Sequence, residues 1–189
     1  MKNIVRLGMI LFIICAISSL ALGLTNKITL PIIEKRNIQA NNESRQIVLK
    51  GAKDFKLLNN FKNDLVEEVY EGSNGSNIVG YTIKTNPKGY GGKMEVIVGI
   101  SADGKITGVN IGTNSETPGL GSKSSEPEFK NQYNNKLTEK EIVVVKGKSS
   151  NDSEIVAISG ATISSKAVTS GVNAAMELFN KELANKEGM

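Results

Sequence analysis

The sequence has no histidine, no tryptophan and a single cysteine, Cys15, in 189 residues. The usual ligand sets of zinc, haem and iron–sulfur sites depend on histidine or on several cysteines, and so do Ser-His-Asp and Cys-His nucleophiles. One cysteine also excludes an internal disulfide. We therefore expect no metal site, and the chemistry left to the side chains is that of carboxylates and hydroxyls.

Aromatic residues and net charge are also scarce. Of the formal charge of +4, Lys2 and Arg6 at the N-terminus contribute two, which leaves +2 for the rest of the chain. With only 5% aromatic residues, few side chains are available to stack on bases. The composition predicts no nucleic-acid partner.

Charge is absent altogether from residues 7–26, which form an apolar run of about 20 residues. As a helix such a run covers about 30 Å, the thickness of the hydrocarbon core of a bilayer. A cleaved signal peptide is the alternative, since Lys2 and Arg6 also suit its basic start. The run is longer than the apolar core typical of signal peptides, so we expect a retained membrane anchor over residues 1–26.

The orientation of this anchor depends on the domain that follows it. Basic residues lie on both sides of the run, so the positive-inside rule is nearly balanced. A long C-terminal domain can translocate whatever its charge. We therefore expect a single-pass protein of the cell membrane, with a cytoplasmic N-terminus and an extracytoplasmic domain on the outer face.

The segment after the apolar run is polar and predicts a second helix. Pro31 suits the first turn of a helix, where its missing N–H would have no partner, and Gly51 is a typical stop. We expect a solvated stalk helix from Pro31 to Lys50, within a stalk segment of residues 27–52.

Strand patterns separated by turn residues follow the stalk. The runs are residues 64–72, 77–86, 93–101 and 105–113, and Asp103-Gly104 between the last two is typical of a hairpin. Such short links predict an antiparallel meander. After a loop-rich segment, two short apolar runs, residues 141–146 and 154–159, predict further strands.

The C-terminal end has the pattern of an amphipathic helix, from about Ser164 to Lys186. Its apolar residues recur every three or four positions and would face one core: Val168, Val172, Ala175, Phe179 and Leu183. Since a sheet needs an apolar cover, we expect an α+β fold. Its one domain, residues 53–189, would have an antiparallel sheet packed against helices.

Two loops are candidates for contact with a ligand. The stretch NSETPGLGSKS, residues 114–124, is not a P-loop, because Ser122 stands where that motif needs a glycine before the lysine. Pro118-Gly119 instead predicts a tight turn whose backbone can approach a flat ligand, although an ordinary surface loop has the same residues. Residues 89–92, GYGG, allow a similar approach or form only a flexible connection.

The bend SGATISS, residues 159–165, leads from an apolar run into the C-terminal helix. A helix start has unpaired N–H groups and the positive end of the helix dipole, which favour a phosphate. Ser159, Thr162 or Ser164 can cap the helix, and Gly160-Ala161 leave the approach open. A capped helix with spare hydroxyls explains the same residues, so both interpretations stay open.

Together the stretches GYGGKMEVIVGISADGKITGV, SETPGLGSK and SGATISSKAV, in this order behind an N-terminal apolar run, carry a resemblance. The chain resembles the G subunit of Rnf-type ion-translocating electron-transport complexes, over most of residues 80–175. The similar C subunit of the sodium-pumping NADH:quinone reductase is longer and fits less well.

The resemblance implies an FMN-binding domain with covalent FMN. In this family the Thr of the SGAT motif carries FMN as a phosphoester, and that position is Thr162 here. Val156 departs from the pattern, since motifs of this type often have Asp at this place. The residues implied around the phosphate are Ser159, Gly160, Ala161 and Ser164, and those implied against the isoalloxazine ring are Glu116, Thr117, Gly119 and Leu120.

The resemblance also implies a function. The chain would relay electrons in a membrane complex, an ion-translocating oxidoreductase that couples ferredoxin and NAD redox chemistry to ion translocation. It would have no catalytic residue of its own and would bind neither ferredoxin nor NAD. Its partners would be the other membrane subunits and a flavin transferase. The alternatives are a membrane-anchored flavin-binding module without a relay role, and an assembly subunit without flavin.

Overall fold

The computed structural model describes residues 2–59, 61 and 64–184. The chain divides into two compact units, Met1–Asn41 and Asn42–Met189. The predicted division into residues 1–26, 27–52 and 53–189 stays a prediction. The second unit already begins inside the predicted stalk.

The N-terminal helix α1 runs from Lys2 to Val48. It is long and apolar enough to cross a membrane, with a mean hydropathy of 2.5 in its most apolar stretch. The stalk residues are helical up to Val48, close to the predicted end, but the predicted helix start at Pro31 is wrong, because α1 continues through this residue. A proline inside a helix removes the hydrogen bond that its own nitrogen would donate, and the helix can be maintained by the bonds on either side.

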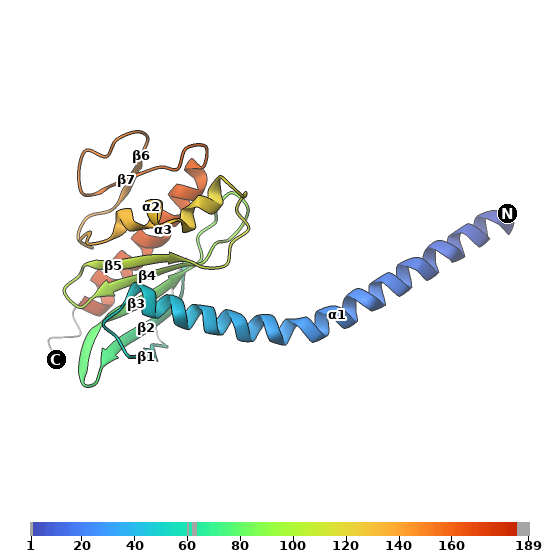
Figure 1. The fold of residues 1–189 in the computed structure, drawn as a ribbon, viewed down its shortest axis with the longest axis horizontal. Helices are drawn as coiled ribbons and strands as arrows, with labels where there is room; N and C mark the ends of the chain where they lie inside the picture. Colours follow the sequence, from blue (N-terminus) through green and yellow to red (C-terminus); the bar gives the residue numbers. More distant parts are fainter. Residues whose placement is uncertain (1, 60, 62–63, 185–189) are drawn as a thin grey trace. The chain divides into compact units, whose positions relative to one another are not determined.

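The second unit is built on a five-stranded antiparallel sheet with its strands in chain order (Figure 1). The predicted meander is confirmed. Strand β1 was not predicted, because its four residues are mostly exposed and too few to show a pattern. The strands are β1 (Asp54–Leu57), β2 (Val66–Asn74), β3 (Asn77–Thr85), β4 (Val96–Ser101) and β5 (Ile106–Ile111).

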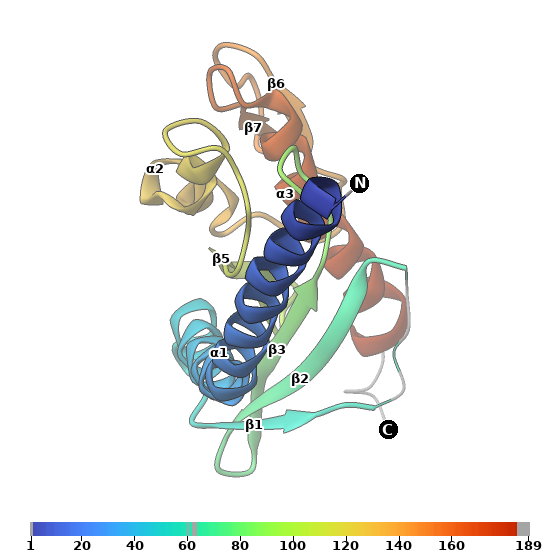
Figure 2. The ribbon, with the colours of Figure 1, turned by 90° about the vertical axis from the view of Figure 1, so that its right-hand side faces the viewer.

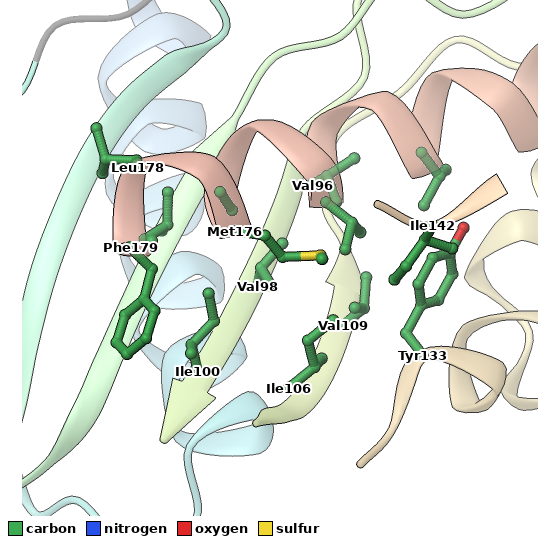
Figure 3. Packing of buried hydrophobic residues seen from close by; sticks show 14 of the residues in the cluster. Val96, Val98, Ile100, Ile106, Val109, Tyr133, Ile142, Met176, Leu178 and Phe179 are labelled. Carbon is green, nitrogen blue, oxygen red and sulfur yellow. The ribbon is translucent and has the colours of Figure 1, made fainter. Parts of the chain in front are cut away.

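Helix α3 (Thr162–Leu178) covers one face of this sheet and continues as a π-helical turn, η3 (Phe179–Leu183) (Figures 1 and 2). Figure 3 shows apolar side chains of α3 and η3 facing those of β4 and β5. The predicted end at Lys186 lies outside the described residues. The predicted stripe is confirmed, because all its members are buried: Val168, Val172, Ala175, Phe179 and Leu183.

The other face of the sheet receives the end of α1, residues 42–48, which belong to the second unit. Gly99 lies between Val98 and Ile100, which are in the core with α3, so it faces away from α3. A Cβ atom on Gly99 would lie 2.3 Å from the carbonyl oxygen of Val48. Only glycine therefore allows this close approach of helix and sheet.

Short elements fill the segment between β5 and α3. They are η1 (Gly121–Ser125), α2 (Pro127–Lys130), η2 (Asn131–Tyr133), β6 (Val143–Val145) and β7 (Glu154–Val156). The two predicted short strands are confirmed, and β6 and β7 pair in parallel. Asn173 of α3 accepts from the backbone N–H of Ile142 at 3.0 Å and donates to its carbonyl at 2.9 Å. This clamp holds the segment against α3, and β7 leads directly into the SGAT bend (Figure 2).

Candidate functional site

The bend before α3 is not held by the predicted serine cap. Ala161 is the N-cap residue, and no side chain caps the helix. The bend is held instead by Ser165, from inside the first turn of α3. The Ser165 hydroxyl donates to the Ala161 carbonyl at 2.9 Å and accepts from the Ile158 N–H at 3.0 Å. Gly160 has a φ of +76°, a conformation that disfavours any residue with a Cβ atom. Sequence reasoning missed Ser165, because nothing in the pattern separates it from its neighbours.

The hydroxyls of the bend fall into two groups. Those of Ser164 and Ser165 are buried and hydrogen-bonded. Ser159 is exposed and Thr162 is half-buried. Within the described residues the hydroxyls of Ser159 and Thr162 have no hydrogen-bond partner. The bend therefore presents two accessible hydroxyls, and one of them, Thr162, stands at the first position of α3.

A single carboxylate connects the three stretches singled out in the sequence. Glu116 accepts a hydrogen bond from the Ser164 hydroxyl at 2.6 Å and another from the Gly91 N–H at 3.0 Å. Glu116 is buried, with only 7% of the residue exposed. Stretches 89–92, 114–124 and 159–165, which are remote in sequence, thus form one site.

Glycines make room for this carboxylate. A Cβ atom on Gly89 would lie 2.2 Å from Glu116 Oε1, and one on Gly121 would lie 2.1 Å from Oε2. A Cβ atom on Gly91 would lie 1.9 Å from the Ser115 carbonyl oxygen. These separations are far below van der Waals contact, so the close packing around Glu116 depends on the absence of these Cβ atoms. The close approach expected at these glycines is therefore to Glu116 and to the Ser115 carbonyl, which are parts of the protein itself.

The turn after Glu116 faces outward. Thr117, Gly119 and Leu120 are exposed, and Gly119 has a φ of +77°. The Thr117 carbonyl accepts the N–H of Leu120 at 3.1 Å, and the Gly119 N–H donates to the Ser122 hydroxyl at 2.9 Å. The predicted tight turn is confirmed, and it presents a surface of backbone and small side chains to solvent.

Large apolar side chains on the three stretches are exposed. Tyr90 is 71% exposed, Leu120 44% and Ile163 56%. A methyl group of Leu120 lies 3.2 Å from the place of a Cβ atom on Gly160, so the second and third stretches also touch at the surface. These side chains suit a flat apolar ligand or another protein.

Exposed lysines surround the site. The backbones of Lys88 and Lys93 pair across the base of the glycine loop, residues 89–92. Lys123 lies in η1, and Lys166 lies in α3. None of them forms an ion pair with another described residue. Exposed acidic residues lie there too, since Glu126 and Glu128 line the groove beside Ser159 together with Lys123, so the accessible charge close to the site has both signs.

A groove of about 280 Å³ lies beside Ser159, between β7 and the α2–η2 segment. Gln132 holds the backbone of Val156 there, accepting its N–H at 2.8 Å and donating to its carbonyl at 3.3 Å. Sequence reasoning missed Gln132, since an amide that binds backbone groups leaves no sequence signal. Val156, the departure from the family pattern, lines the same groove.

Comparison with known proteins agrees with this geometry. Residues 89–177 match the FMN-binding domain family, and this range includes all three stretches. The chain is 44% identical to the G subunit of the Na(+)-translocating ferredoxin:NAD(+) oxidoreductase complex of Acetobacterium woodii, over 94% of this chain and 92% of the relative. This chain belongs to the family of G subunits of ion-translocating oxidoreductase complexes.

Other members of this family are similar over most of their length. The G subunit of the proton-translocating ferredoxin:NAD(+) oxidoreductase complex of Clostridium ljungdahlii is 35% identical, over 88% of this chain and 86% of the relative. That of the ion-translocating oxidoreductase complex of Methanosarcina acetivorans is 32% identical, over 96% and 97%. The predicted family is confirmed.

The fold is also that of a solved relative. The crystal structure of the C subunit of Na(+)-translocating NADH-quinone reductase from Parabacteroides distasonis superposes with a TM-score of 0.62. The superposition covers 79% of this chain and 94% of that chain, at 19% identity. The predicted α+β FMN-binding fold is confirmed.

Proposed function

We propose that this chain is the FMN-carrying electron-transfer subunit of a membrane complex that couples ferredoxin and NAD redox chemistry to ion translocation. FMN is attached through its phosphate to Thr162. The choice of Thr162 is supported by the different surroundings of the hydroxyls in the bend. The Thr162 hydroxyl is accessible at a helix start, while those of Ser164 and Ser165 form hydrogen bonds inside the protein. The names of the relatives supply the reaction of the complex.

The first turn of α3 binds the phosphate end. Its unpaired backbone N–H groups and the helix dipole stabilise the phosphoester oxygens. Gly160 and Ala161 keep bulk away from this turn, and the exposed Ser159 hydroxyl is available to the phosphate. Lys166 adds positive charge in the first turns of α3, while Glu126 and Glu128 offset that of Lys123 beside the bend.

The ester forms at the Thr162 oxygen. That oxygen would bond to the flavin phosphorus as its proton passes to a base, and the phosphoanhydride bond of an activated flavin nucleotide would break, so that the other phosphate of the nucleotide leaves with the bonding electrons. The donor and the general base belong to a flavin transferase, because Thr162 has no basic partner among the described residues. The groove lined by Val156 and Ser159 is adjacent and suits contact with that enzyme.

The exposed turn after Glu116 holds the ring. Thr117, Gly119 and Leu120 present backbone and a methyl-bearing side chain on one side of the bend, and Tyr90 and Ile163 extend this surface. Bound FMN supplies the electron-carrying chemistry that the side chains of this chain lack. In this proposal the protein positions the flavin, without independent catalysis and without binding ferredoxin or NAD itself.

The proposed location is supported by α1 and by the membrane complexes of the relatives. A helix able to cross a bilayer anchors the chain in the cell membrane, with the N-terminus in the cytoplasm and the FMN domain on the outer face. On that face a dissociated FMN would diffuse away. A covalent link to Thr162 prevents this loss.

The test is flavin fluorescence in a denaturing gel of the full chain, coexpressed with a flavin transferase. Wild type and Thr162→Ser should fluoresce, because both have a hydroxyl on this carbon, and Thr162→Ala should be dark. Ser170→Ala, on the exposed side of the same helix, is the control and should fluoresce. A fluorescent Thr162→Ala band would refute the acceptor, and a dark wild-type band would refute covalent attachment.

A flavin-binding module without a relay role is the second candidate, because the same bend and turn would hold FMN in either case. Purification from native membranes separates the two. Copurification with several polytopic subunits supports the relay. A flavin-loaded chain that purifies alone, with no electron exchange with membrane subunits, supports the module.

A further inference from the structure

Among the described residues, Glu116 is the one carboxylate that accepts hydrogen bonds from both of the other stretches, 89–92 and 159–165. Ser164 donates from the first turn of α3 at 2.6 Å, and Gly91 donates from the glycine loop at 3.0 Å. Among the described residues no other hydrogen bond joins stretch 114–124 to α3 or to residues 89–92. This side chain is therefore the hydrogen-bonded link among the three stretches.

The carboxylate is committed to the protein and is not offered to a ligand. Glu116 is buried, and its oxygens fill the space where Cβ atoms of Gly89 and Gly121 would be. An acceptor of two N–H or O–H groups needs no proton of its own, so the contacts suit the ionised form. Charge-assisted bonds of this kind are about twice as strong as neutral ones.

We propose that Glu116 is a positioning residue that holds the first turn of α3 and the glycine loop in the arrangement that presents Thr162 for flavin attachment. Ser164 lies two residues after Thr162, so fixing the Ser164 side chain fixes the rotation of the turn that carries the Thr162 hydroxyl. Glu116 acts through Ser164 and Gly91 without touching the flavin phosphate. This inference rests on the proposed function of Thr162.

Two substitutions separate geometry from charge. Glu116→Ala removes both hydrogen bonds and leaves the Gly91 N–H without its acceptor. Glu116→Gln can keep both, since the amide oxygen accepts from Gly91 and the amide nitrogen donates to the Ser164 oxygen, whose hydroxyl turns to bond elsewhere. A positioning role thus predicts rescue by glutamine, while a role of the negative charge predicts none.

The measurement is the rate of FMN attachment by a flavin transferase to the purified full chain in detergent. Glu116→Ala should slow attachment about tenfold or more, the factor expected for loss of a charge-assisted hydrogen bond. Glu116→Gln should recover most of this loss. Adding Ser164→Ala to Glu116→Ala should have little further effect, because the bond between them is already gone.

Melting temperatures and a remote control exclude a general loss of stability. Asn180→Ala removes a comparable pair of hydrogen bonds to Thr138 at the other end of the C-terminal helix and should leave the attachment rate unchanged. If Glu116→Ala does not fold, Ser164→Ala decides, and it should slow attachment by itself.

Several results would overturn the inference. The first is attachment at the wild-type rate in Glu116→Ala or, if that variant does not fold, in Ser164→Ala. The second is a folded Glu116→Gln that is labelled as slowly as Glu116→Ala. Each of these leaves the proposed function intact, since wild type is labelled. A wild-type chain without label under an active transferase would instead overturn the proposed function itself.

Discussion

Ser165→Ala tests whether the bend before α3 is held from inside the helix. Ser165 is fully buried, and its hydroxyl is the acceptor for the Ile158 N–H at 3.0 Å. The Ala161 carbonyl, its other partner, keeps the backbone N–H of Ser165 at 3.0 Å. The substitution therefore leaves one half-buried donor, the Ile158 N–H, without a partner, so the cost of an unsatisfied buried N–H is the upper bound.

The size of the effect follows from these contacts. An unsatisfied buried N–H costs about 1–3 kcal/mol. Alanine gains about 0.5 kcal/mol of helix propensity over serine, so the free energy of unfolding should fall by about 0.5–2.5 kcal/mol. For a domain of this size that lowers the melting temperature by about 2–8 °C.

The assay is thermal unfolding of the full chain in detergent, followed by circular dichroism. Ser170→Ala is the matched control, because Ser170 is an exposed serine on the same helix. It should melt within about 2 °C of wild type, as surface substitutions usually do. Equal melting temperatures for Ser165→Ala and Ser170→Ala would contradict the role given to Ser165.

Two further predictions concern the sheet and the bend. Burial alone would lower the pKa of Lys84, but hydrogen bonds from its ammonium to Glu67 and Glu95, each at 3.0 Å, raise it above 10.5. Its stabilisation is therefore complete below that pH and lost as the pH rises past the raised pKa, so denaturant titrations from pH 9 to about 12 should show a smaller alkaline loss in Lys84→Met. Gly160→Ala should lower the free energy of unfolding by about 1–2 kcal/mol in the same titration at neutral pH, because φ is +76° and the new Cβ would lie 3.2 Å from Leu120. An unchanged unfolding midpoint would count against this.

The elements predictable from the sequence are those with a repeating apolar pattern. The four main strands are short runs rich in apolar residues and are linked by turn residues, so the meander of β2 to β5 could be predicted. The stripe from Val168 to Leu183 likewise predicted the face of α3. Strand β1 is too short for such a pattern, and Pro31 is compatible with both a helix start and a helix interior, so the uninterrupted α1 could not be predicted.

The stretches that form the site were easier to predict than the hydrogen bonds that join them. Motif resemblance brought stretches 89–92, 114–124 and 159–165 together, and the structure joins them. The roles of Ser165, Gln132 and the Glu116 carboxylate depend on which hydrogen-bond partner each side chain meets in three dimensions. Such long-range pairings leave no periodic trace in a single sequence.

Peptide mass spectrometry of the mature full chain tests the central claim most directly. Trypsin should release residues 149–166, which contain every hydroxyl of the bend. We predict that this peptide gains the mass of one FMN less one water, with fragment ions that place the addition on Thr162. An unmodified peptide from a chain made with an active flavin transferase, or an addition on Ser159 or Ser164, would contradict the account.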